Sequence, residues 1–438
     1  MGNKIKPNFV NLGSDMLGIY ISGYEFDLES EAILDKVFQK KRKEVIDDIL
    51  LSENPKEALD IFHKNINLLK GVRAIIFDDK FRAKNSQSLA NKRFGKYSIF
   101  GIGNYQKACL LSQDIVVAMM DKNGSGQAPI WRSFCVNLDT NVVSHLSDLY
   151  YKNNRDNDDD LNQLLLHIKK VEAQTTISPY LIENAFNESK IDEKITKEVL
   201  LANLSFEEMQ YEDVKNKKFN LINPNFSDKK RIEEQWKSFA TPIDKIPQYE
   251  VIYILLMKVF IIKQRSPKNA SFKNQTKQLI NFINDELSIY LEMETVLSLL
   301  YLKNDKDVMG FFGKLQLGAK GLLSKFRNTA YDLFLFRLMI DEMAERINND
   351  SEFYFHSFVS HDGNLQKVLE LNPLSRIVFD NSRYHARFEK NIHNIGLDES
   401  NLKRYSKYST TRTERFGTID LSALSLKLEQ EVNELIKS

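Results

Sequence analysis

The stretch Phe134-Cys-Val-Asn-Leu-Asp-Thr-Asn141 decides how this 438-residue chain can fold. Residues 134–138 form a short apolar run that predicts a strand, and the run stops at Asp139-Thr140-Asn141. Apolar residues then recur at helical spacing, at Val142, Val143, Leu146 and Leu149. A buried strand that leads directly into a helix predicts an α/β protein, with a parallel sheet flanked by helices.

The same design recurs nearer the end of the chain. Phe353–Val359 is strongly strand-like and ends in Ser360-His361-Asp362, after which an apolar helical pattern begins at Leu365. In open parallel sheets ligands bind at the carboxyl ends of strands, so Asp139 and Asp362 stand where catalytic carboxylates are expected. The structural alternative is that each aspartate only caps the helix that follows it.

Two further acids join them as candidates. Asp332 is followed at helical spacing by Leu335, Phe336 and Met339, so its helical face is apolar. A buried carboxylate needs compensation, either by a metal ion or by an ion pair with Arg327 or Arg337. Glu183 follows Ser178-Pro179 by one helical turn and, taken alone, is typical of a surface glutamate.

Clustered carboxylates suit a hard divalent cation, because Mg²⁺ prefers oxygen ligands and such ions activate water and stabilise charge on a phosphodiester. The seven histidines are dispersed along the sequence and no pair has the spacing of a zinc protease. The sequence therefore favours a carboxylate site for Mg²⁺ or Mn²⁺.

These residues resemble the PIN domain nucleases. The likeness consists of a strand ending in Asp-Thr-Asn (139–141), Glu183 in a later helix, Asp332 in an apolar helix, and Ser-x-Asp-x-x-Leu (360–365) after a strand. In that family four acids converge at one end of a parallel sheet and bind Mg²⁺ or Mn²⁺ to hydrolyse RNA, and sometimes DNA. The likeness covers residues 131–187 and 325–380, and the stretch between Glu183 and Asp332 is longer than a compact PIN domain allows.

The resemblance implies that Asp139, Glu183, Asp332 and Asp362 are the metal ligands and catalytic residues, with support from Asn141 and Ser360. Asp341 lies on the same predicted helix as Asp332 and is the alternative third acid. The implied activity is that of a Mg²⁺- or Mn²⁺-dependent endoribonuclease, with a toxin or phage-defence role by analogy. The alternatives are a non-catalytic regulatory or scaffold protein with a PIN-like fold, and a phosphohydrolase with Asp139 as nucleophile.

The length predicts several structural units. We expect an N-terminal α+β region (1–130), a PIN-like core (131–187 and 321–380), a helical insertion (188–320), and a basic segment with a C-terminal helix (381–438). The helical stripe that runs from Leu421 to Leu435 predicts a packing face, with a dimer seam as the alternative. A homo-oligomer and a regulatory partner protein both stay open.

Composition limits the compartment and the partners. The N-terminus has no apolar core of a signal peptide, and Val251–Ile262 is too short to span a bilayer. There are only 2 cysteines, which suits a reducing compartment. These three features predict a cytoplasmic protein with no membrane attachment. The net charge of +1 provides no overall attraction for nucleic acid. Basic residues with no acid between them do occur in 251–284 and 310–331, and segment 374–416 is basic and rich in tyrosine, which favours single-stranded or structured RNA.

Overall fold

The structure is a computed structural model that describes residues 28–78, 80, 92–120, 132–152, 158–186, 192–239, 247–267, 270–345, 353–361, 363–380, 383–407, 415 and 417–437. The chain divides into two compact units. The first comprises residues 1–83, 107–130 and 375–387, and the second comprises residues 84–106, 131–374 and 388–438. The sequence also predicts a strand at Gly18–Ile21 and a loop at 122–127, and both segments lie outside the described residues.

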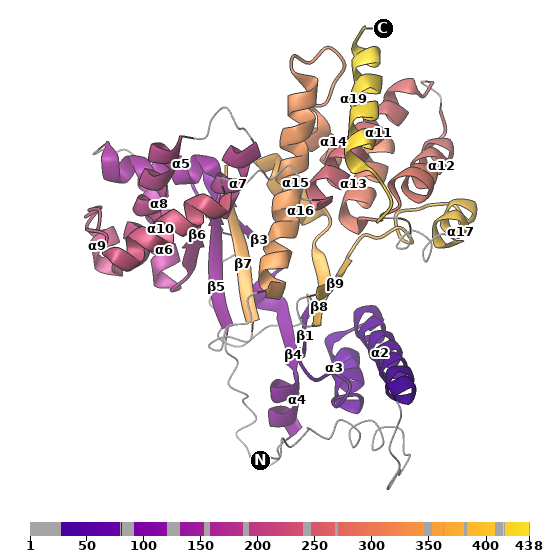
Figure 1. Ribbon diagram of the computed structural model, residues 1–438, viewed down its shortest axis with the longest axis horizontal. Helices are drawn as coiled ribbons and strands as arrows, with labels where there is room; N and C mark the ends of the chain where they lie inside the picture. The colour runs from indigo at the N-terminus through magenta and orange to yellow at the C-terminus, as the bar shows by residue number, and fades with distance from the viewer. Residues whose placement is uncertain are drawn as a thin grey trace. The chain divides into compact units, whose positions relative to one another are not determined.

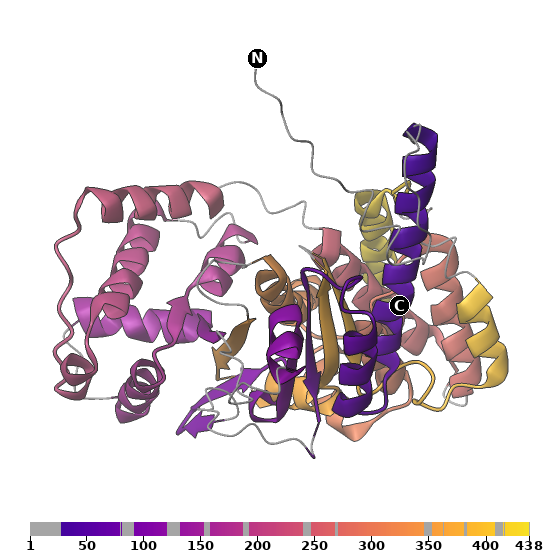
Figure 2. The same cartoon turned by 90° about the horizontal axis from the view of Figure 1, so that it is seen from below.

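The first unit is a four-stranded sheet covered by helices. Its strand order is β4 (Ala108–Ser112), β1 (Val72–Phe77), β8 (Leu374–Asp380) and β9 (Arg383–Phe388), with β1 antiparallel to both β4 and β8. Helices α2 (Leu28–Leu51), α3 (Pro55–Lys64) and α4 (Gln113–Met120) accompany it. Apolar side chains of α2 and α3 pack with those of β1 in one core. The ribbons of these indigo helices lie beside the strands of this unit (Figure 2). The guanidinium of Arg42 in α2 donates to the carbonyl of Leu68 and to the carboxylate of Asp380, which ties helix to sheet.

The second unit contains a five-stranded sheet (Figure 1). Its order is β2 (Lys92–Phe94), β3 (Tyr97–Gly101), β7 (Phe353–Ser360), β5 (Arg132–Leu138) and β6 (Gln174–Thr176). β5 runs parallel to both β7 and β6, whereas β3 is antiparallel to β7 and to β2. The structure thus confirms a mixed α/β protein, but the sheet is mixed rather than wholly parallel, because the hairpin β2–β3 adds to the free edge of β7.

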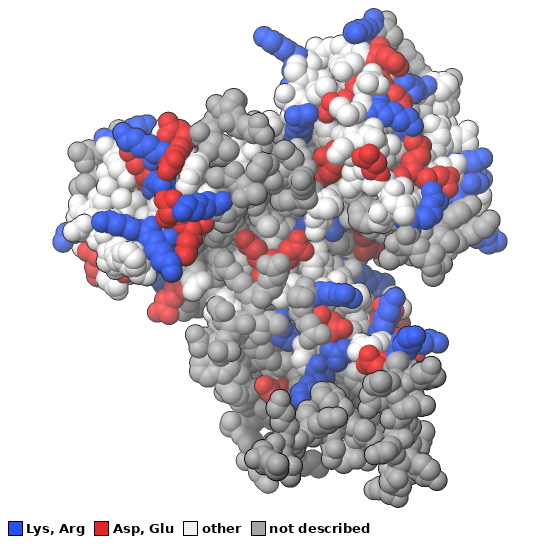
Figure 3. Space-filling view, viewed as in Figure 1, with Lys and Arg blue, Asp and Glu red and all other residues white. Residues whose placement is uncertain are grey.

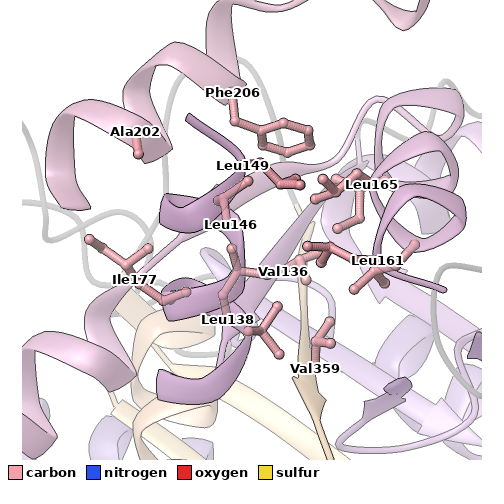
Figure 4. Close-up of a cluster of buried hydrophobic side chains, with 14 of the residues drawn as sticks. Val136, Leu138, Leu146, Leu149, Leu161, Leu165, Ile177, Ala202, Phe206 and Val359 are labelled. Atoms are coloured by element: carbon pink, nitrogen blue, oxygen red, sulfur yellow. The ribbon is translucent and has the colours of Figure 1, made fainter. Parts of the chain in front are cut away.

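Helices cover one face of this sheet. Apolar side chains of β5 and β7 pack with those of α5 (Thr140–Tyr151), α6 (Asp159–Lys170) and α8 (Glu193–Glu208) in a single core (Figure 4). Val136, Leu138 and Val359 are fully buried there. Since side chains alternate along a strand, Asn137, Phe358 and Ser360 point to the opposite face. Helix α15 (Leu322–Glu345) packs against β7.

The remaining helices of this unit are α7 (Ser178–Phe186), α9 (Tyr211–Lys215), α10 (Phe226–Phe239), α11 (Pro247–Arg265), α12 (Phe272–Phe282), α13 (Glu292–Leu302), α14 (Lys306–Phe312), α16 (Gly363–Leu371), α17 (Glu399–Lys407) and α19 (Leu421–Lys437), with the short turns η1 (Tyr105–Lys107) and η3 (Ile283–Leu287). The predicted helical nature of 188–320 is confirmed for the residues that the structure describes.

Helix α19 packs against α11 within the chain. Leu428 and Val432 of its apolar stripe are fully buried, so the stripe is an intramolecular packing face. Helix α11, which contains the apolar stretch Val251–Ile262, is buried along most of its length. Among the described residues, no helix has both the length and the apolar character that crossing a membrane requires.

Candidate functional site

Asp139 follows the last residue of β5 and caps helix α5. Its backbone N–H donates to the carbonyl of Val359, which continues the pairing of β5 with β7 by one residue (3.1 Å). One carboxylate oxygen accepts from the N–H of Thr140 (2.8 Å), and the other accepts from the hydroxyl of Ser360 (2.9 Å). The capping interpretation is therefore correct, and Ser360 donates a hydrogen bond to the capping carboxylate.

Glu183 lies close to the same strand end. It belongs to α7, and the hydroxyl of Thr140 donates to its carboxylate. Thr140 thus connects the two acids, through its N–H to Asp139 and through its hydroxyl to Glu183. Two carboxylates 44 positions apart in the sequence meet at the carboxyl end of β5.

Tyr331, the residue before Asp332, connects α15 to the helix that carries Glu183. The Tyr331 side chain is buried in α15, and its hydroxyl donates to the carbonyl of Pro179 in α7, one helical turn before Glu183. Burial, and then the negative charges of Glu183, Asp139 and Asp332, raise the pKa of this hydroxyl well above its ordinary value. The three acids therefore act electrostatically on one buried atom.

Asp332 has a cationic neighbour that the sequence did not predict. The ammonium of Lys314 lies 2.8 Å from its carboxylate, and both side chains are partly exposed. Arg327 and Arg337, the arginines suggested by the sequence, instead pair with Glu429 and Glu294. Lys314 precedes α15 and reaches Asp332 from the connection that follows α14.

The other predicted site residues stand as follows. Asp341 is nine residues after Asp332 on α15, which at about 100° per residue places it half a turn around the helix and about 13 Å along it. Asn141 is exposed in the first turn of α5. Asp362 lies outside the described residues.

The donor set fits a hard divalent cation in kind, since Asp139, Glu183 and Asp332 offer carboxylate oxygens. Within the described part of the chain, no three His, Cys, Asp or Glu side chains form a group that could hold a metal ion. Asp362, the fourth predicted ligand, does not enter that comparison. Carboxylates that lie close together repel one another, and a cation placed among them would relieve that repulsion.

Most basic residues of segment 251–284 have partners within the chain. Lys258 lies 3.9 Å from Glu286, Arg265 lies 2.6 Å from Glu431, and Lys273 lies 3.6 Å from Asp398. Lys263 donates to the carbonyl of Tyr301 at the end of α13 (2.6 Å). Lys268 lies outside the described residues, and Lys277 is exposed. Basic and acidic side chains are interspersed on the face shown in Figure 3.

Three residues of the candidate site were missed by the sequence analysis as functional residues, namely Thr140, Lys314 and Tyr331. Thr140 was quoted only as part of a motif, although a hydroxyl next to a strand-end aspartate is a usable signal. Lys314 and Tyr331 reach the site through tertiary packing alone. Comparison of the chain with protein-family models, curated proteins and solved structures gives no match.

Proposed function

We propose that this protein is a divalent-metal-dependent nuclease with a PIN-like core that hydrolyses phosphodiester bonds, RNA being the preferred substrate. The observation that carries the proposal is that Thr140 bonds both Asp139 and Glu183 at the carboxyl end of β5, while Tyr331, next to Asp332, bonds the carbonyl of Pro179 one turn before Glu183. The helices α5, α7 and α15, which are far apart in the sequence, carry or adjoin these three acids. The three carboxylates are partly buried. Asp362 would complete the set, since it follows the neighbouring parallel strand β7.

Each residue would have a defined part. Ser360 and the N–H of Thr140 fix the carboxylate of Asp139, and the hydroxyl of Thr140 fixes that of Glu183. Mg²⁺ or Mn²⁺ held by these oxygens would lower the pKa of a water molecule and neutralise charge on the phosphodiester. The Tyr331 hydroxyl, bonded to the carbonyl of Pro179, stays protonated and anchors α15 against α7.

The alternative is a non-catalytic protein that keeps the same fold. The ion pair between Lys314 and Asp332 favours it, because an internal ammonium is a common way to neutralise a structural carboxylate. In that case the acids would hold the helices together and bind no metal.

A cleavage assay separates the two. Labelled single-stranded RNA, structured RNA and single-stranded DNA are incubated with the full chain and Mg²⁺ or Mn²⁺. We expect metal-dependent cleavage that falls at least a hundredfold in Asp139→Asn. The matched control is Asp148→Asn, which removes a half-exposed carboxylate on the same helix that pairs with Lys152 one turn away. Equal cleavage by wild type and Asp139→Asn, or no cleavage of any substrate by wild type, would contradict the proposal.

A further inference from the structure

A second polar cluster lies at the same end of the five-stranded sheet. It consists of Tyr97 at the start of β3, His145 in α5, Asp158 before α6 and His361 after β7. The start of β3 adjoins the end of β7, because Ser98 pairs with Ser360 in the antiparallel ladder. The fold thus joins two histidines that are 216 positions apart in the sequence.

The hydrogen bonds of Tyr97 set the state of His145. The Tyr97 hydroxyl donates to the carboxylate of Asp158 (2.7 Å) and lies 2.8 Å from Nδ1 of His145. A phenol has one proton, and here Asp158 accepts it. Nδ1 of His145 therefore carries its own proton and donates to the Tyr97 oxygen, which leaves the lone pair of the neutral imidazole on Nε2.

His361 faces the same space. Its ring centroid lies 4.4 Å from that of Tyr97 and 5.5 Å from that of His145. Its Nε2 atom is buried and has no hydrogen-bond partner in the part of the chain that the structure describes. A buried ring nitrogen without a partner is costly, so it points to a ligand at this position.

We propose that His145 and His361 bind a first-row transition-metal ion, with Zn²⁺ as the representative. Two imidazoles bound tetrahedrally at about 2.0–2.1 Å place their ring centroids about 5 Å apart, close to the 5.5 Å observed. The carboxylate of Asp158 bonds the Tyr97 hydroxyl, which in turn bonds Nδ1 of His145. Metal-ligating histidines are oriented in this way, by a hydrogen bond at the ring nitrogen that does not bind the metal. The two histidines are not among the acids of the carboxylate site, so this proposal does not depend on nuclease activity.

The charges around the two rings suit a cation. Lys96 pairs with Asp158 (2.8 Å), and its backbone N–H donates to Asp160 (3.2 Å). With both imidazoles neutral, the carboxylates of Asp158 and Asp160 and the ammonium of Lys96 together give a local charge of −1. Imidazole nitrogens select Zn²⁺, Co²⁺, Ni²⁺ or Cu²⁺ over Mg²⁺, and water molecules would complete the coordination.

The test is Zn²⁺ titration of the full chain by calorimetry, with Co²⁺ absorption as an independent readout of coordination. We expect one Zn²⁺ per chain at this site. Its affinity should fall at least tenfold in His145→Ala and in His361→Ala, and about tenfold in Tyr97→Phe, which keeps the buried ring and removes only the hydroxyl. Circular dichroism checks that each variant is folded, and His145→Gln replaces His145→Ala if the latter is not.

Two controls locate the ion. His393→Ala removes an exposed histidine of the same unit and should leave the affinity unchanged. Asp139→Asn should also leave it unchanged, because the ion is not held by the acids. Wild-type affinity in a folded His145→Ala, His361→Ala double variant would overturn the proposal. So would loss of Zn²⁺ binding in Asp139→Asn, or absence of binding by the wild type.

Discussion

Replacing Lys314 by methionine removes the ammonium that lies 2.8 Å from the carboxylate of Asp332. The two side chains keep 33% and 22% of their exposure, so the pair lies between a surface pair and a buried one. Surface pairs contribute about 0–1 kcal/mol, and breaking a buried pair costs about 3–5 kcal/mol. We expect the free energy of unfolding of Lys314→Met to fall by about 1–3 kcal/mol.

The same variant tests the proposed cation site without any activity assay. If Asp139, Glu183 and Asp332 share a cation, removal of the ammonium beside Asp332 should make an added divalent cation bind more tightly. Mn²⁺ that binds only the folded state stabilises it by about 2.7 kcal/mol at a hundred times its Kd. Mn²⁺ should therefore raise the unfolding temperature of Lys314→Met more than that of the wild type.

Urea unfolding with and without Mn²⁺ measures both effects. Lys320→Met is the matched control, because Lys320 is an exposed lysine of the same connection between α14 and α15. The reasoning fails if Lys314→Met is as stable as Lys320→Met. It also fails if Mn²⁺ stabilises the two variants equally.

Three more predictions test the core, a buried lysine and the site. Leu161→Ala should lower the free energy of unfolding by about 2–5 kcal/mol, whereas Leu426→Ala, at a residue 60% exposed, should change it little. Equal losses of stability in urea unfolding of the two variants would contradict this. Burial lowers the pKa of Lys263 to about 8, so below that pH the charged ammonium destabilises the folded state. The free energy of unfolding of the wild type, relative to that of Lys263→Met, should therefore rise from pH 8 to about 10.4. A difference between the two proteins that does not change with pH would refute this. Thr140→Val keeps the side-chain shape but removes the hydrogen bond to Glu183, so the rate of nuclease cleavage should fall about tenfold or more. Full activity of this variant would show that the hydrogen bond does not position Glu183.

Local patterns in the sequence predict most of the elements. The alternating and apolar run Phe353–Val359 becomes β7, and the stripe from Leu421 becomes α19, because periodicity depends only on near neighbours. The strand ends at Asp139 and Ser360 are predictable for the same reason. Their adjacency also follows from the sequence, since parallel strands with helical connections bring their carboxyl ends together.

Partners chosen by tertiary packing could not be predicted. β8 pairs with β1, about 300 residues earlier, and nothing in either strand specifies the other. Asp332 pairs with Lys314 rather than with Arg327 or Arg337, because those arginines are engaged by glutamates of α19 and α13. The antiparallel hairpin β2–β3 at the edge of β7 was missed, and with it the position of Tyr97 between two histidines.

We propose that Asp139, Glu183 and Asp332 share a divalent cation. Anomalous scattering from crystals grown with Mn²⁺ tests it most directly, because it locates the ion rather than its effects. We predict a manganese peak within about 2.3 Å of carboxylate oxygens from these three residues. Well-ordered acids in the positions described here, with no peak among them at millimolar Mn²⁺, would contradict the account.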